Sequence, residues 1–279
     1  MNYRHIFHAG NPADVMKHAV MALILEHLRV KPAPFCVLDT HAGIGRYDLT
    51  SEAAQKTLEY EDGVGRLFGA PAPHPSLTPY LEAVAAINPD GVLRAYPGSP
   101  RIARAALRPQ DRLVLGELHP DDARALRREF RDDPQVAVHE IDAYVALKAH
   151  LPPKEKRGLV LIDPPFEQPD EFSRMAEGLA AAHRRWPTGI YALWYPIKER
   201  AAVWRFQDAV EKTGIPKILL AELTWHPEDT HMRLNGSGLL IVNPPWRLDE
   251  TLKETLAALH AVLPSTGGGV SVTWLAPEA

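Results

Sequence analysis

Five short apolar runs, separated by stretches of helical periodicity, constrain the fold of this chain more than any other feature. Mainly apolar runs of this length are typical of strands buried on both faces, and their alternation with helices favours a parallel, doubly wound sheet. We therefore predict an α/β fold. The predicted strands cover residues 35–39, 112–117, 136–141, 158–162 and 190–194. The helical stretches cover residues 100–107, 121–130 and 170–186, and another follows the helix-start signal at Asn11.

One region interrupts this alternation. Between Gly45 and Pro97 the sequence has two helical patterns, at residues 51–68 and 77–86, and no convincing strand. A connection from a strand to a helix is normally short, so we predict a small helical insertion at residues 47–96. Residues 1–46 and 97–279 then form the main domain, with an N-terminal segment at 1–18. The alternative is that one of these helices is the ordinary crossover helix.

The composition excludes several classes of protein. The 279 residues are 46% hydrophobic and 24% charged, with a formal net charge of −4, which excludes a disordered chain and a polybasic nucleic-acid coat. The single cysteine, Cys36, excludes a disulfide framework and a multi-cysteine zinc site. No apolar run approaches the ~20 residues that cross a bilayer, and the N-terminus lacks a signal-peptide pattern. We expect a soluble, cytoplasmic protein without a membrane partner.

A glycine-rich turn follows the first predicted strand. Asp39 ends the strand, and Gly43-Ile44-Gly45 lets the backbone turn tightly and approach a ligand. A dinucleotide-binding fingerprint would need a third glycine at the position of Asp48. The pattern is instead similar to the first motif of S-adenosylmethionine-dependent methyltransferases, although any tight turn after a strand can have this form.

Acidic residues also follow the second and third predicted strands. Glu117 is suited to hold two ribose hydroxyls, and Asp142 is suited to an adenine amino group. Because ligands of open α/β sheets gather at the carboxyl ends of the strands, we expect these acids to share one site. Each acid taken singly could also be an exposed loop charge.

The fourth predicted strand ends in Asp163-Pro164-Pro165-Phe166. The two prolines remove two N–H donors and leave free carbonyls in a rigid loop. This tetrapeptide is similar to the [Asp/Asn/Ser]-Pro-Pro-[aromatic] motif of methyltransferases that modify amino groups in nucleic acids. Asp163 and the Pro164 carbonyl can accept both N–H bonds of an exocyclic amine, and Asp163 can then take its proton. Phe166 can stack on a base taken out of its helix.

A second sequence, Asn243-Pro244-Pro245-Trp246, fits the same motif. The position in the sheet favours the first copy. The catalytic loop should follow the strand beside the glycine turn, and Asp163 follows the fourth strand in order. Asn243 comes at least two strands later, towards the edge of the sheet.

The N-terminal segment from Tyr3 to His18 identifies a family. Its sequence is Tyr-Arg-His-Ile-Phe-His-Ala-Gly-Asn-Pro-Ala-Asp-Val-Met-Lys-His. Together with His41-Ala42-Gly43 and the loop at Asp163, it resembles the RlmJ-type 23S ribosomal RNA adenine-N6 methyltransferases over nearly the whole chain. Its histidines, without cysteine, match a metal site poorly, so we expect no metal. The resemblance implies a Rossmann-like S-adenosylmethionine-dependent methyltransferase fold with an inserted small helical subdomain, and methylation of one adenine in 23S rRNA.

The resemblance also implies roles for individual residues. It makes Asp163 the proton acceptor and Tyr3 a contact to the RNA substrate. Position 143 is alanine where glycine is expected, which still allows a backbone contact. The contacts to S-adenosyl-L-methionine that it implies are His18, His41, Ser99, Glu117, Asp142, Ala143 and Asp163.

Cations that could meet RNA phosphates occur in two places. Arg4 and Lys17 flank the proposed site in the sequence, and we expect both to contact RNA. Nine arginines against five acids lie between Arg94 and Arg131, and they form either an RNA-binding surface or a solvated helix face. We expect a monomer that acts on 23S rRNA, naked or in an assembly particle. A DNA adenine-N6 methyltransferase and a non-catalytic nucleic-acid-binding factor remain as alternatives.

Overall fold

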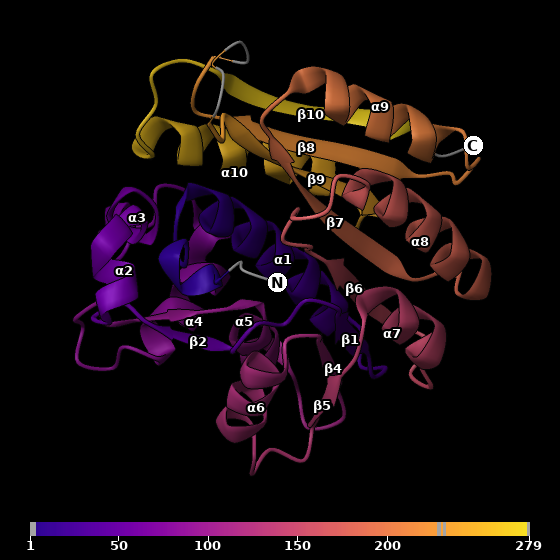
Figure 1. Ribbon diagram of the computed structural model, residues 1–279, viewed down its shortest axis with the longest axis horizontal. Coiled ribbons are helices and arrows are strands. Elements are labelled where there is room, and N and C mark those ends of the chain that lie inside the picture. The colour runs from indigo at the N-terminus through magenta and orange to yellow at the C-terminus, as the bar shows by residue number, and fades with distance from the viewer. Residues whose placement is uncertain (1–3, 228–229, 231–232, 278–279) are drawn as a thin grey trace.

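A central sheet of eight strands carries helices on both faces (Figure 1) in the computed structural model, which describes residues 4–227, 230 and 233–277. The strand order is β10-β8-β9-β7-β6-β1-β4-β5. The five predicted strands are confirmed, and all five are parallel. They are β1 Cys36–Asp39, β4 Arg112–Glu117, β5 Val136–Glu140, β6 Gly158–Ile162 and β7 Ile190–Ile197. The doubly wound α/β class is therefore confirmed, with β7 continuing beyond its predicted end at Trp194.

Antiparallel strands extend the sheet beyond β7. They are β8 Ile218–Thr224, β9 Gly236–Val242 and β10 Gly269–Ala276. β9 pairs antiparallel with both β7 and β8, and β10 pairs antiparallel with β8. The prediction of a parallel sheet therefore holds for the five predicted strands but is wrong for the sheet as a whole. Every residue of β8 and β9 is buried, so their sequences resemble those of the parallel strands.

The helices cover the two faces of the sheet in separate groups, each with its own apolar core. One face packs against α1 Pro12–Val30, α5 Ser99–Ala106, α6 Pro120–Glu129 and α10 Leu248–Val262. The other packs against α7 Ala143–His150, α8 Glu171–Arg185 and α9 Arg200–Glu211. Consecutive strand residues point to opposite faces, so Val37 lies in the first core and Leu38 in the second. None of the described helices is long and apolar enough to span a membrane.

Residues 47–96 leave the region of β1 and return to the same place. Strands β2 Arg46–Asp48 and β3 Ala95–Pro97 pair antiparallel, so the expectation of no strand here was wrong at both ends. Leu58, with a left-handed φ of 55°, splits the first predicted helix. Buried residues such as Tyr80 share the core of α1. The other elements are α2 Glu52–Thr57, α3 Glu59–Asp62, η2 Val64–Arg66, η3 Pro75–Leu77 and α4 Thr78–Ala86, and η1 His5–Phe7 precedes α1.

The two Pro-Pro motifs lie at opposite ends of the strands. Val242 at the end of β9 pairs with Tyr191 near the start of β7, because these strands are antiparallel. Asp163 follows the parallel strand β6 and therefore lies at the carboxyl ends of the parallel strands. Asn243 has a left-handed φ of 53°, and its side-chain amide donates to two backbone carbonyls of the loop before β7, both at 2.8 Å. Asn243 therefore ties two loops together, far from the predicted site.

We predict that Asn243→Ala lowers the free energy of unfolding by about 1–3 kcal/mol, because it leaves two carbonyls without their donor. Urea unfolding monitored by circular dichroism measures this change. Asn243→Gly is the matched control, since glycine tolerates the left-handed backbone and isolates the hydrogen bonds. Unchanged stability in both variants would contradict the proposed tie.

Candidate active site

Three loops meet at the carboxyl edge of the parallel strands. The register places His41, Glu117 and Asp163 at the same level, each two residues beyond a paired position of β1, β4 and β6. The Asp163 N–H donates to Nδ1 of His41 at 3.3 Å, and the Gly43 N–H donates to Oε2 of Glu117 at 2.8 Å. β4 and β6 lie on opposite sides of β1, and open α/β sheets bind ligands at this reversal of strand order. The structure thus brings these predicted residues together.

Lys17 holds Asp163 in a buried ion pair. Its Nζ lies 2.5 Å from Oδ2 of Asp163 and 2.9 Å from Oδ1 of Asp14, and its side chain is only 5% exposed. Burial by itself would lower the pKa of Lys17, but the two carboxylates outweigh it and raise the pKa above its ordinary value. Lys17 is therefore a fixed cation beside Asp163. The predicted contact to an RNA phosphate would require Lys17 to lie open to solvent, and Lys17 does not.

Asp14 organises the N-terminal segment, although no motif in the sequence pointed to it. Its Oδ2 lies 2.9 Å from Nε2 of His5 and accepts the Gly10 N–H at 2.9 Å. Although burial opposes the shift, the charges of His5 and Lys17 hold the pKa of Asp14 well below its usual range. A signal was available in the spacing, because residues three apart on a helix, such as Asp14 and Lys17, share one face.

An aromatic wall lies beside Lys17. Phe166 has a φ of 52°, a left-handed conformation that is uncommon outside glycine and clusters at functional sites. Its ring packs edge-on against Phe172 and Trp194, with centroid distances of 4.9 and 5.9 Å. The Lys17 Nζ lies 5.6 Å from the centre of the Trp194 ring. Trp194 Nε1 also donates to the hydroxyl of Ser237 at 2.6 Å, which fixes the ring.

The glycine turn and Glu117 hold each other in place. Gly43 and Gly45 have φ values of 60° and 82°, and a Cβ on Gly43 would overlap the hydroxyl of Tyr47. Glu117 accepts the N–H groups of Gly43 and His119, both at 2.8 Å. Burial raises the pKa of Glu117. Because a carboxylate has about four acceptor sites, it can still accept from the hydroxyl group of a ligand.

Asp39 is fully buried at the end of β1. Burial raises its pKa to about 7, while hydrogen bonds from the Ser99 hydroxyl and the His41 N–H oppose this shift. Ser99 is the first residue of α5 and is itself buried. The predicted residue Ser99 therefore lies directly beside the end of β1.

The two histidines of the predicted site are neutral. Burial lowers the pKa of His18 to about 3 and the pKa of His41 to about 4. Nδ1 of His41 accepts the Asp163 N–H at 3.3 Å and also lies 2.9 Å from the hydroxyl oxygen of Thr40. His18 is buried with its Nδ1 at 2.7 Å from the hydroxyl of Tyr96. Its contact with a cofactor stays a prediction.

Comparison with known proteins identifies the family. The sequence model of a family described as ribosomal RNA large subunit methyltransferase D, RlmJ, matches residues 32–276. The ribosomal RNA large subunit methyltransferase J of Escherichia coli K12 is 46% identical over 279 residues, with 100% of both chains covered. The chain belongs to the RlmJ family. The Haemophilus influenzae methyltransferase J is 44% identical, again over 100% of both chains. A crystal structure of a Legionella pneumophila protein has a TM-score of 0.87 at 33% identity, covering 95% of this chain and 98% of that one.

The remaining residues predicted for an RlmJ-type site have other partners here. Asp142 caps α7 by accepting two backbone N–H groups of its first turn, and Ala143 is the buried first residue of that helix. Arg4 donates to Oδ1 of Asp122 on α6 at 2.8 Å. Tyr3 lies outside the described residues. The cofactor and RNA contacts of these residues stay predictions.

The arginines that could have formed an RNA-binding surface are mostly neutralised. Among the described residues, eight of the nine between Arg94 and Arg131 form ion pairs with carboxylates. The pairs are Arg94–Asp90, Arg101–Glu129, Arg104–Asp133, Arg108–Asp111, Arg112–Glu155, Arg124–Asp121, Arg127–Glu140 and Arg131–Asp132. This pairing favours the interpretation of these arginines as a solvated helix face over their interpretation as an RNA-binding surface.

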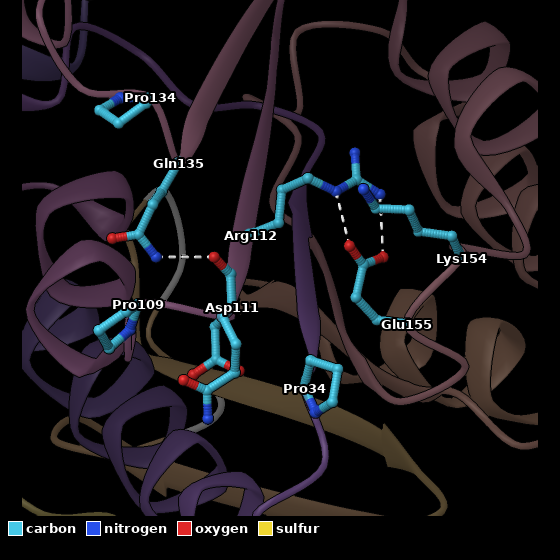
Figure 2. Close-up of a pocket in the computed structure, with 9 residues that line it drawn as sticks. Pro34, Pro109, Asp111, Arg112, Pro134, Gln135, Lys154 and Glu155 are labelled. Atoms are coloured by element: carbon cyan, nitrogen blue, oxygen red, sulfur yellow. Dashed lines mark hydrogen bonds and ion pairs between the residues drawn. The ribbon is translucent and has the colours of Figure 1, made fainter.

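The pocket in Figure 2 lies at the amino ends of the parallel strands, where β4 and β5 begin. Its volume is about 390 Å³. Arg112 donates to both carboxylate oxygens of Glu155, at 2.9 and 3.0 Å, and the Gln135 amide donates to the Asp111 carbonyl at 2.7 Å. These polar groups form hydrogen bonds with one another and hold the starts of the strands in place. None of the residues predicted for the RlmJ-type site lines this pocket.

We predict that Asp39→Asn changes how stability depends on pH. Between its ordinary value of 3.8 and about 7, Asp39 keeps a proton in the folded protein that the unfolded chain has lost. Folding is then less favourable as the pH rises, by up to about 1.4 kcal/mol per pH unit. Asparagine cannot titrate, so urea unfolding at about pH 5 and about pH 8 should show the variant gaining relative to the wild type at the higher pH. Parallel pH profiles for the two proteins would contradict a buried, protonated Asp39.

Proposed function

We propose that this protein transfers a methyl group from S-adenosylmethionine to the N6 amine of one adenine in 23S rRNA. The observation that carries the proposal is the carboxylate of Asp163, held by Lys17 at the reversal of strand order and beside an aromatic wall. Membership of the RlmJ family supports an RNA of the large ribosomal subunit as substrate.

The residues at this edge fit S-adenosylmethionine. The ligand carries a positive charge on sulfur, and the carboxylates of Glu117 and Asp142 suit it in charge. Glu117 keeps acceptor capacity for the ribose hydroxyls, and the glycine turn carries no Cβ at Gly43 and Gly45. The neutral His41 and the buried Ser99 would line the same crevice. When bound, S-adenosylmethionine supplies a methyl group on a sulfonium sulfur, which is open to attack by a nitrogen lone pair.

Asp163 then orients and activates the amine. Lys17 occupies Oδ2 of Asp163, so Oδ1 is left to accept one N–H of the adenine amine. The Pro164 carbonyl accepts the other N–H. Two acceptors on one side favour a pyramidal nitrogen, because a flat conjugated amine directs its lone pair into the ring. As the N–C bond forms and the C–S bond breaks, the amine becomes acidic and gives a proton to Asp163.

Lys17 makes this arrangement rigid and balances its charge. A lone buried carboxylate would be costly, and the ion pair offsets that cost. Phe166 and Trp194 offer aromatic surfaces for an adenine that has left its stack. We further propose that the protein acts as a cytoplasmic monomer, without a metal, on naked 23S rRNA or an assembly particle. Residues 1–46 and 97–279 then form the methyltransferase domain, and 47–96 its insertion.

We predict that Asp163→Ala lowers the turnover number by about 10²–10⁴-fold, the usual contribution of a general base. Transfer of a radioactive methyl group to 23S rRNA measures the rate. Asn243→Ala is the matched control, since it changes the other copy of the motif and should keep wild-type turnover below its unfolding temperature. Near-normal turnover of Asp163→Ala would reject this assignment.

We predict that Glu117→Gln weakens S-adenosylmethionine binding about ten-fold or more, since charge-assisted hydrogen bonds are worth roughly 1.5–3 kcal/mol. An amide offers one acceptor oxygen where the carboxylate offers two. Calorimetric titration measures the affinity. Glu140→Gln is the control, because Glu140 is the exposed partner of Glu117 across β4 and β5. Equal affinity in both variants would place the ribose elsewhere.

A further inference from the structure

Glu59, in the 47–96 segment, binds the N-terminal segment at two points. Its carboxylate lies 2.9 and 3.1 Å from Nδ1 of His8, and its Oε2 accepts the side-chain N–H of Asn11 at 3.0 Å. The left-handed Leu58 immediately before it ends α2 and starts α3, which sets the direction of the Glu59 backbone. Both partners of Glu59 belong to the stretch that leads into α1.

Backbone contacts reinforce this junction. The Val64 N–H donates to the Gly10 carbonyl at 2.8 Å, and the Thr57 hydroxyl donates to the Phe7 carbonyl at 2.5 Å. A Cβ on Gly63 would overlap the Gly10 carbonyl oxygen, so the two segments touch backbone to backbone there. The 47–96 segment therefore contacts Phe7, His8, Gly10 and Asn11.

The contacted residues lead directly to the catalytic carboxylate. Asn11 caps α1 by accepting the Asp14 N–H at 2.9 Å, and the Gly10 N–H donates to the Asp14 carboxylate. Asp14 in turn binds Lys17 at 2.9 Å, and Lys17 binds Asp163 at 2.5 Å. A continuous chain of contacts thus runs from the surface of the 47–96 segment to the acid that receives the proton.

The contact between Glu59 and His8 is charge-assisted. Hydrogen bonding to Glu59 raises the pKa of His8 above its ordinary value. The same contacts lower the pKa of Glu59, although burial opposes the shift. Asn11 and Asp14, one and two contacts further along the chain, are buried. Such buried groups have few alternative partners, so a displacement of Asn11 is passed on to Asp14.

We propose that Glu59 is a positioning residue for the methyl transfer, which acts by fixing the His8–Asn11 turn so that Asp14 and Lys17 hold Asp163 in place. This inference rests on the proposed function, since it assigns Asp163 the role given above. It gives the 47–96 segment a part in catalysis without contact to substrate or cofactor. Support of this kind matters because a displacement of about 1 Å can reduce a rate about 100-fold.

The test compares Glu59→Ala with Glu61→Ala, an exposed acid of the same short helix. Glu59→Ala should lower the turnover number about 10- to 100-fold at saturating rRNA and S-adenosylmethionine. Glu61→Ala should match the wild type. Glu59→Gln keeps one acceptor oxygen and should recover part of the loss. If the turnover numbers of Glu59→Ala and Glu61→Ala are equal, the proposal is wrong.

A double-variant cycle separates positioning from a loss of stability. In a Lys17→Met background the chain of contacts is already broken at Lys17, so adding Glu59→Ala should not lower turnover further. Independent, multiplying losses would overturn the proposed route. Hydrogen exchange gives a readout without activity: Glu59→Ala should speed exchange of the amides at residues 7–14. An inactive wild type would count against the proposed function, whereas normal exchange in Glu59→Ala would count against this inference.

Discussion

One buried lysine between two carboxylates determines the geometry of this site. A buried charge is tolerated only when it is paired and well placed, so Lys17 requires Asp14 on its own helix and Asp163 after β6. That requirement joins two parts of the chain that are distant in sequence: the start of α1, which continues the N-terminal segment, and the Pro-Pro loop. Removing Lys17 would leave both carboxylates without this cation, in a space from which water is largely excluded. The position of the catalytic loop therefore depends on the N-terminal segment, and the position of that segment depends on the loop.

The fold was predictable where local pattern and topology agree. Mainly apolar runs marked the five parallel strands, and the acids at or after their ends, such as Glu117 and Asp163, could be placed at the carboxyl ends of the strands from the sequence alone. The antiparallel strands β8 to β10 were not foreseen, because a buried antiparallel strand has the same uniform apolar pattern as a buried parallel one. Strands β2 and β3 are too short to show any period. Their pairing is a long-range event that local sequence does not report.

The site shows the same division. The residues that a motif carries, from the glycine turn to Phe166, were found because their chemistry depends on neighbours in sequence. Asp14 and Trp194 were missed because their roles depend on contacts made only in the folded chain. Lys17 was recognised as a cation near the site, but its partner was expected to be a phosphate. Charge alone does not tell whether a lysine faces solvent or a buried carboxylate.

The neutralised arginines of α5 and α6 have a kinetic consequence. A protein attracts a polyanion over long distances through unbalanced positive charge, and this chain carries a net charge of −4 with most arginines of that region already paired. Its encounter with RNA then gains little from electrostatic steering, and each capture must break ion pairs or rely on close fit. Such an enzyme discriminates after collision instead of before it.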